Sequence, residues 1–294
     1  MARVAIIGPG AIGGVMAARL HRTGRHEIIV CARHPLDRLE VEAKDETIAF
    51  QPRMITDPRQ AEPVDWILVA TKAYDAGGAA AWFTGLRTSS IPVAILQNGV
   101  EHVERFSKYC PAERILPVVV NAPAERASPG HIRQRGKARL TVPEGALGRE
   151  FQALFADSGV EVSLTSDFKS AAWKKLCLNT AGALPALLRN SAAIQDDPQI
   201  ADLARQMVVE CMAVARAEDA VLEPDLPDTL LEICRKAPRD SINSLHADRL
   251  AARPLEIDAR NGVIVRLGRK HRIATPLNAM AVSLLASLSR SERE

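Results

Sequence analysis

Three glycines at a fixed spacing follow a short apolar run at the start of the chain. Residues 4–7 have the composition of a buried strand, and the residues after Ile12 can continue as an amphipathic helix. Between them lies a G-x-G-x-x-G pattern. In this setting the first glycine makes a tight turn, the second admits a pyrophosphate, and the third lets the helix pack on the strand. Free N–H groups at the helix start attract phosphates. The pattern predicts a dinucleotide site at Gly8, Pro9, Gly10, Ala11, Ile12 and Gly13, with an ordinary tight turn as the alternative.

The length and charge of the chain limit its class. With 294 residues, 47% of them hydrophobic, it is long enough for two domains. Its net charge is +3, from 38 basic and 35 acidic side chains, so nothing global favours a nucleic acid or membrane partner. The richest basic stretch, residues 133–139, is expected to be the exposed face of a hairpin.

The cysteines and histidines of the sequence predict neither a disulfide framework nor a metal site. Five cysteines are spread without C-x-x-C spacing, which favours reduced thiols in a cytosolic protein. The seven histidines are scattered and form no i, i+4 pair, so no metal site is expected. The first strand begins too early for a signal peptide, and no apolar run approaches the ~20 residues of a membrane span. We therefore expect a soluble, cytoplasmic protein.

The order of strand-like and helical segments predicts two domains. Apolar runs at 4–7, 27–31, 66–70, 93–96 and 115–120 alternate with helical segments, which is typical of a parallel sheet covered by helices. Residues 131–134 and 138–142 are predicted to pair as an antiparallel hairpin around Arg135 and Gly136. Helical periodicity begins near residue 166. The predicted architecture is α/β: a doubly wound Rossmann-type domain over 1–165 and an all-helical domain over 166–294.

Cofactor choice is read about 20 residues beyond the glycines, where a carboxylate would bind the ribose hydroxyls of NAD. Here the second strand ends at residues 29–34 with Arg33 in that position, and no carboxylate follows until Asp37. A planar guanidinium suits a 2'-phosphate. Arg33 therefore favours NADP(H), with a solvent-exposed loop arginine as the alternative.

Polar residues follow two predicted strands of the sheet. Lys72 comes after the strand at 66–70, and Asn98 comes after the strand at 93–96. The carboxyl ends of parallel strands face the ligand crevice. Both residues are therefore candidates for ligand contact, although each could simply terminate its strand.

In the helical half, Lys175 and Asn179 lie four residues apart and so share a helix face, which Gly182 and Ala183 would continue. The alternative is a surface lysine on an amphipathic helix. Further along, Pro254 is placed to start a helix with Glu256 in its first turn. Spacing alone leaves the segment from Ser244 to Glu256 ambiguous.

Over nearly its full length the chain resembles ketopantoate reductases (2-dehydropantoate 2-reductases). The resemblance implies that residues 1–165 are an NADP-binding Rossmann domain, that residues 166–294 are a helical substrate-binding domain, and that the protein reduces a 2-oxo acid with NADPH. It further implies that Lys175 is the proton donor, that Glu256 contacts the reacting oxygen or its proton, and that Lys72 lies beside the nicotinamide and its ribose. Asn98, Asn179 and Ser244 would bind substrate, with Asn98 also near the cofactor. The resemblance rests on residues 8–14, Lys72, residues 97–99, 128–130 and 173–179, Ser244, residues 256–258, Asn261 and Gly262.

Two positions depart from the family pattern. Ala183 stands where an asparagine is common, and Asp75 stands where a glutamine is frequent. The missing amide leaves open a related NADP-dependent dehydrogenase that acts on another 2-oxo acid or on a β-hydroxy acid. A protein that senses NADPH without turnover is a further alternative. Monomer and homodimer are both compatible with the sequence.

Overall fold

The structure is a computed structural model that describes residues 1–86, 90–191, 194 and 196–291. The chain divides into two compact units. The first comprises Met1–Gln97 and Glu101–Phe168, and the second comprises Asn98–Val100 and Lys169–Glu294. The short segment that contains Asn98 thus groups with the second unit, although it follows a strand of the first.

A six-stranded parallel sheet forms the centre of the first unit. Its order is β5-β2-β1-β6-β7-β8, and every neighbouring pair is parallel. This confirms the predicted doubly wound sheet. The strands are β1 (Ala2–Ile7), β2 (His26–Cys31), β5 (Arg53–Ile55), β6 (Trp66–Val69), β7 (Val93–Ile95) and β8 (Ile115–Pro117).

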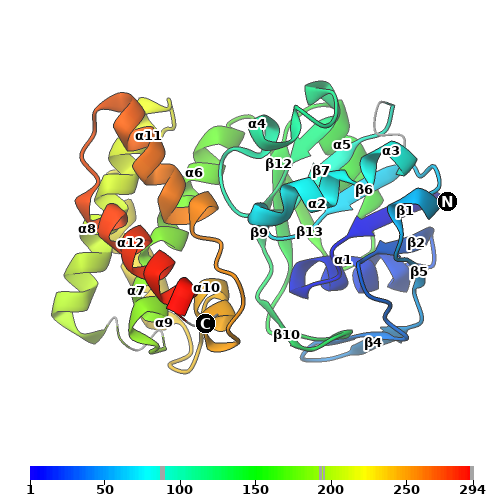
Figure 1. The fold of residues 1–294 in the computed structure, drawn as a ribbon, viewed down its shortest axis with the longest axis horizontal. Helices are drawn as coiled ribbons and strands as arrows, with labels where there is room; N and C mark the ends of the chain where they lie inside the picture. Colours follow the sequence, from blue (N-terminus) through cyan, green and yellow to red (C-terminus); the bar gives the residue numbers. More distant parts are fainter. Residues whose placement is uncertain (87–89, 192–193, 195, 292–294) are drawn as a thin grey trace. The chain divides into compact units, whose positions relative to one another are not determined.

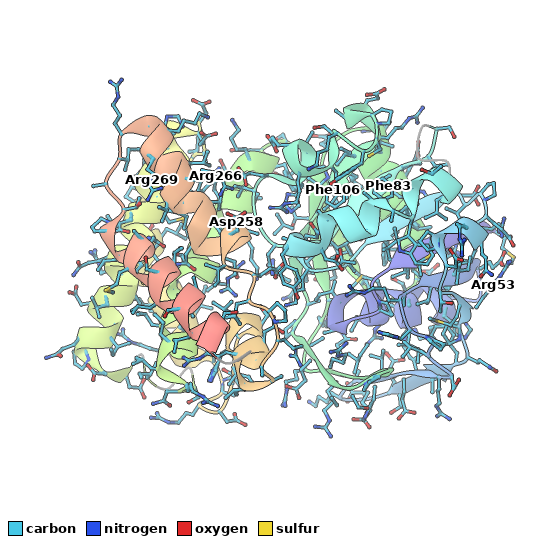
Figure 2. All side chains as sticks on the ribbon, viewed as in Figure 1. Arg53, Phe83, Phe106, Asp258, Arg266 and Arg269 are labelled. Atoms are coloured by element: carbon cyan, nitrogen blue, oxygen red, sulfur yellow. The ribbon has the colours of Figure 1, made fainter. Side chains whose placement is uncertain are left out.

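Neighbouring residues of each strand point to opposite sides of this sheet, and both faces are buried because each packs into its own apolar core. Val4 and Ile6 join a core that includes α1 (Ala11–Arg22) and α5 (Ala146–Leu154). Ile7 joins the opposite core, where the rings of Phe83 and Phe106 lie 6.0 Å apart (Figure 2). Figure 1 shows α1 on one side of the sheet and α2 and α3 on the other. The helices of this second side are α2 (Ala76–Ala80), α3 (Phe83–Leu86) and α4 (His102–Phe106).

The predicted hairpin between residues 131–134 and 138–142 is wrong. Strand β11 (His131–Gln134) pairs antiparallel with β10 (Ala124–Ser128) and parallel with β3 (Leu39–Glu42), which pairs with β4 (Thr47–Phe50). Strand β12 (Arg139–Pro143) belongs to another sheet, between β9 (Val119–Asn121) and β13 (Glu161–Thr165). The tight turn lies instead at Gly130, whose φ is +77° and which has no room for a side chain. The single strand expected at 115–120 also divides, into β8 and β9 of two sheets.

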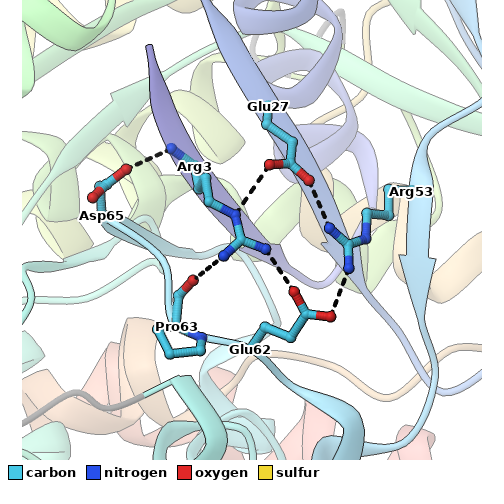
Figure 3. A network of polar contacts seen from close by, with 6 residues as sticks. All are labelled: Arg3, Glu27, Arg53, Glu62, Pro63 and Asp65. Atoms are coloured by element: carbon cyan, nitrogen blue, oxygen red, sulfur yellow. Dashed lines mark hydrogen bonds and ion pairs between the residues drawn. The ribbon is translucent and has the colours of Figure 1, made fainter.

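Alternating charges link the amino ends of three strands in the first unit (Figure 3). The guanidinium of Arg3 on β1 donates to Glu27 on β2 at 3.0 Å and to Glu62 at 2.7 Å. Arg53 on β5 donates to the same two carboxylates, at 2.7 Å each. Each carboxylate therefore bridges two arginines, and the guanidinium groups hold the pKa values of both below the ordinary range. This network lies at the opposite strand ends from the glycine loop.

The second unit is helical, as predicted, and is built on one apolar core. No helix within the described ranges is long and apolar enough to cross a membrane. The helices of the second unit are α6 (Phe168–Ala181), α7 (Ala183–Leu188), α8 (Pro198–Ala217), α9 (Leu226–Lys236), α10 (Ser244–Leu250), α11 (Val263–His271) and α12 (Pro276–Ser291). Short 3₁₀ helices in the first unit are η1 (Pro58–Gln60), η2 (Ala73–Asp75) and η3 (Ala112–Arg114).

The helix expected to start at Pro254 begins only at Asp258, so Glu256 precedes it and does not occupy its first turn. It opens with a π-helical turn, η5 (Asp258–Gly262), which runs into α11. Asp258, the first residue of this turn, pairs with Arg266 of α11 at 2.7 Å (Figure 2). π turns occur frequently at functional sites.

A buried polar cluster holds the π turn in place. The Asn261 amide donates to Oγ1 of Thr180 on α6 at 2.8 Å and to Oδ1 of Asn278 on α12 at 2.9 Å. Asn278 donates in turn to Glu210 on α8 at 2.7 Å. Glu210 also accepts the backbone N–H groups of Leu277 and Asn278, which start α12. Four helical segments are therefore joined through hydrogen bonds whose partners are buried or partly buried, which favours one arrangement.

Candidate functional site

The glycine loop has the geometry that its spacing predicts. Gly8 has φ +90°, and a Cβ there would lie 2.8 Å from Cγ2 of Thr71. Its N–H donates to the carbonyl of Cys31, the last residue of β2, at 3.0 Å. A side chain at position 13 would lie 2.2 Å from the carbonyl oxygen of Gly8. Both positions therefore require glycine for reasons of backbone conformation and close packing.

Gly10 differs from these two glycines, since a Cβ there would meet nothing within 4 Å. It is the N-cap of α1, where no side chain caps the helix and the first turn holds no acidic residue. Pro9, Ala11 and Ile12 keep part of their surface exposed. No capping side chain and no acidic residue of the first turn therefore compete for the first N–H groups of the helix, and an anionic pyrophosphate fits this loop.

Arg33 lies two residues beyond the end of β2, and its side chain is 82% exposed. Its guanidinium lies 3.5 Å from the carboxylate of Asp75 on η2. Position 75, noted in the sequence only as a departure from the family pattern, thus provides the charge that faces Arg33. An added phosphate group would compete with Asp75 for the arginine.

Gln97 connects the ends of β6 and β7. Its side-chain amide donates to Oγ1 of Thr71 at 3.0 Å and to the carbonyl of Lys72 at 3.3 Å. The backbone carbonyl of Gln97 contacts Nε2 of His102 at 2.9 Å. Burial lowers the pKa of His102 to about 4, so this imidazole is neutral at pH 7. His102 was not predicted from the sequence, since a single histidine carries no motif. These contacts hold the Lys72 backbone beside the glycine loop.

In the second unit Asn98, Asn179 and Glu256 form a chain of hydrogen bonds. The Asn98 amide donates to Oε2 of Glu256 at 2.9 Å, and the Asn179 amide donates to Oδ1 of Asn98 at 3.3 Å. Glu256 is only 4% exposed. Three residues that are remote in the sequence are thus brought together, and the carboxylate is oriented by a neutral donor.

Lys175 lies on α6 one turn before Asn179 and keeps part of its surface exposed. Burial and, to a smaller extent, the nearby Arg260 guanidinium together lower the pKa of Lys175 to about 8. The lysine therefore has a proton-transfer pKa near neutrality. Such a value is what a general acid or base requires.

Arg260 was not predicted from the sequence, although it contacts two of the predicted residues, Asn179 and Ser244. It is 1% exposed on the π turn, donates to the carbonyl of Asn179 at 2.5 Å, and lies 3.5 Å from Oγ of Ser244. Burial lowers the pKa of Arg260 to about 10, while Glu256 and Asp248 oppose that shift. The only sequence signal was a spacing of four residues between Glu256 and Arg260.

The remaining two predicted positions differ in exposure. Ser244 is exposed at the start of α10, where the Asn243 side chain caps the helix. Ala183 is completely buried in the helical core, and it begins α7, since α6 already ends at Ala181. Position 183 therefore does not continue the helix face of Lys175 and Asn179 as the spacing predicted.

Comparison with known families decides the class of this protein. Residues 4–147 match the family model "Ketopantoate reductase PanE/ApbA", and residues 167–289 match "Ketopantoate reductase PanE/ApbA C terminal". The chain belongs to the ketopantoate reductase family. This confirms the resemblance on which the site prediction rested and makes the chain an oxidoreductase.

Curated relatives carry the same family name. A "2-dehydropantoate 2-reductase" of Caulobacter vibrioides is 49% identical over 285 residues, which cover 97% of this chain and 98% of the relative. One of Mycobacterium tuberculosis is 41% identical and covers 97% of both chains. Among solved structures, a ketopantoate reductase of Ralstonia eutropha has a TM-score of 0.90 at 30% identity, covering 99% of this chain and 100% of that one.

Proposed function

We propose that this reductase converts ketopantoate to pantoate with NADPH as the hydride donor, and that Lys175 is the general acid. The observation that carries the proposal is the Lys175 ammonium, with its lowered pKa, one helical turn from the hydrogen-bonded Asn179, Asn98 and Glu256. The names of the relatives support the substrate.

The residues of the first unit fit a nicotinamide dinucleotide phosphate. The open face at Gly10 and the uncapped start of α1 would receive the pyrophosphate, and Arg33 would bind the 2'-phosphate. Lys72 would contact the nicotinamide ribose. When bound, the cofactor supplies a hydride to the carbonyl carbon of the substrate.

A ketone that accepts hydride develops negative charge on its oxygen, and that oxygen must be protonated. An ammonium group can first stabilise the oxygen and then transfer its proton. With a pKa of about 8, most Lys175 side chains carry this proton at pH 7. The lowered pKa also makes the transfer easier than from an ordinary lysine.

The other polar groups orient the reactants. Glu256 would accept a hydrogen bond from the reacting hydroxyl, with Asn98 keeping its carboxylate in position. Asn179 and Ser244 would bind the substrate carboxylate through neutral hydrogen bonds. Holding the carbonyl carbon in one orientation contributes to catalysis by lowering the entropic cost of reaction.

The decisive experiment follows the loss of NADPH absorbance with a panel of branched and straight 2-oxo acids that includes ketopantoate. We expect the highest kcat/KM with ketopantoate and a weaker reaction with NADH. Absence of NADPH oxidation with every acid would contradict the proposal.

A second candidate is reduction of a different 2-oxo acid, because Ala183 provides no side-chain amide and is buried. A clear preference for another acid in the same panel would select it. We further propose a cytoplasmic location and a monomer or homodimer. A solved relative from Staphylococcus aureus, 26% identical, is described as a dimeric ketopantoate reductase.

A further inference from the structure

Arg260 is a buried cation whose hydrogen bonds are incomplete. The described residues provide two acceptors, the Asn179 carbonyl at 2.5 Å and the Ser244 hydroxyl at 3.5 Å. Its Nε is buried with no hydrogen-bond partner in the described part of the chain. Burying a charged group without full compensation costs free energy, and an apolar side chain of similar size would avoid that cost. The stability of the fold therefore does not explain why an arginine occupies this position.

The backbone is shaped around this side chain. A Cβ at position 182 would lie 2.8 Å from one Nη of Arg260 and 3.1 Å from the Asn179 carbonyl oxygen. Gly182 consequently leaves room for the guanidinium beside α6. The π turn that carries Arg260 is held by the neighbouring Asn261, whose amide bonds to α6 and α12.

The charges around Arg260 leave an excess of positive charge. Lys175 faces it from α6, Glu256 from the segment before the π turn, and Asp248 from α10. Asp248 also pairs with Arg253 at 2.9 Å. Once that pair is set aside, two cations and one carboxylate remain. A ligand with a single negative charge would restore the balance.

We propose that Arg260 is a positioning residue for the substrate carboxylate, one that fixes the Ser244 hydroxyl and the Asn179 backbone and selects 2-oxo acid anions over neutral 2-oxo amides. This inference rests on the proposed function, because it takes a 2-oxo acid as substrate. Arg260 itself is almost fully buried, so it acts through Ser244, which is exposed, and through its charge.

The test compares a 2-oxo acid with its own amide, which has the same shape without the charge. R260M keeps an unbranched side chain that can fill much of the same space and removes the charge and the donors. Without the guanidinium, Ser244 is no longer held in position to donate a hydrogen bond to the substrate carboxylate. Loss of a hydrogen bond to a charged group changes affinity by roughly 10- to 100-fold. We therefore expect R260M to raise KM for the acid by about that factor and to leave KM for the amide within a few-fold of the wild-type value. Equal changes for both compounds would overturn the proposal.

The pH profile gives a second readout. Removing the positive charge of Arg260 raises the pKa of Lys175, so the decline of kcat at high pH should move to higher pH in R260M and stay in place in R260K. The matched control is R249M. Arg249 is also buried, at 7% exposure, and its guanidinium donates to the Ala186 and Leu187 carbonyls. We expect R249M to lower Tm without changing the preference for the acid or the pH profile.

A double-mutant cycle keeps the proposal testable if R260M does not fold. A lysine at position 260 cannot reach Ser244 as the guanidinium does, so S244A should raise KM for the acid much less in R260K than in the wild-type enzyme. Equal effects of S244A in both backgrounds would overturn the positioning role.

Wild-type kinetics separate the two proposals. If the enzyme reduces a 2-oxo acid other than ketopantoate, only the substrate assignment fails, and that acid and its amide then serve for the comparison. If it reduces no 2-oxo acid with either NADPH or NADH, both proposals are wrong.

Discussion

The side-chain amide of Asn98 donates a 2.9 Å hydrogen bond to the carboxylate of Glu256, although 158 residues separate them in the sequence. Glu256 is buried, so the neutral donor orients a charge that water barely reaches. Within the second unit this contact joins the short segment after β7 to the segment that precedes the π turn.

Asn98→Asp should disturb this pair more than Asn98→Ala does. The first change places a second carboxylate next to Glu256, and two like charges at that distance raise the pKa of one of them. We expect a larger loss of kcat/KM for Asn98→Asp than for Asn98→Ala at pH 8, with partial recovery near pH 5. Steady-state kinetics over that range measure the difference, and identical pH profiles for the two variants would contradict the role of the pair.

Lys175→Ala should lower kcat at least ~100-fold with a 2-oxo acid, which is the lower end for loss of a general acid. In the wild-type enzyme kcat should fall as pH rises through about 8, since only the protonated lysine can donate. The slope at high pH should be absent in the residual activity of the variant. Normal turnover by Lys175→Ala would rule out the assignment.

Lys175→Met should at the same time stabilise the fold at pH 7. The folded-state pKa of Lys175 lies below its ordinary value of 10.5, so the unfolded chain binds more protons between pH 8 and 10.5. Burying the protonated Lys175 side chain therefore lowers the free energy of unfolding at pH 7. Replacing it with an uncharged side chain should raise that free energy by on the order of 1 to 3 kcal/mol. The gain, measured by chemical denaturation, should shrink as pH rises toward 10.5. A gain that does not depend on pH would contradict this account.

Arg33→Ala should weaken NADPH binding much more than NADH binding, because only NADPH carries the 2'-phosphate. Asp75→Asn should strengthen NADPH binding, since Asp75 lies 3.5 Å from the Arg33 guanidinium and would repel a phosphate there. Arg59→Ala is the matched control, because Arg59 is 90% exposed and pairs with Asp57, the N-cap residue of its own short helix η1. Calorimetry with both cofactors tests all three variants, and equal losses for the two cofactors in Arg33→Ala would refute the phosphate role.

Gly10→Ala and Gly13→Ala should distinguish an effect on cofactor affinity from an effect on the stability of the fold. A methyl group at position 13 would lie 2.2 Å from the Gly8 carbonyl, so this variant should lose Tm and cofactor binding together. At position 10 the methyl group meets nothing within 4 Å, so Tm should be unchanged while cofactor affinity falls. If Gly10→Ala bound NADPH normally, the loop would not approach the pyrophosphate as proposed.

Much of the first unit could be predicted locally. The glycine spacing and the apolar runs depend on neighbours in the sequence, and the predicted parallel sheet and the start of α1 were confirmed. The hairpin prediction failed because Arg135 and Gly136 resemble a turn, whereas β11 and β12 each pair with strands from other parts of the chain. Which strands pair with one another depends on the side chains that the pairing buries. The residues next to a short strand in the sequence do not determine that packing.

For the helical half, the sequence by itself determined the position of α6 and the shared face of Lys175 and Asn179, since both follow from helical periodicity. Only the tertiary structure decided that Asn98 bonds Glu256 and that Arg260 is buried beside Lys175. The physical reason is that burial and charge proximity depend on which remote segments pack together. An arginine on a helix is normally solvated, and here the space left by Gly182 and the turn anchored by Asn261 place it inside the fold.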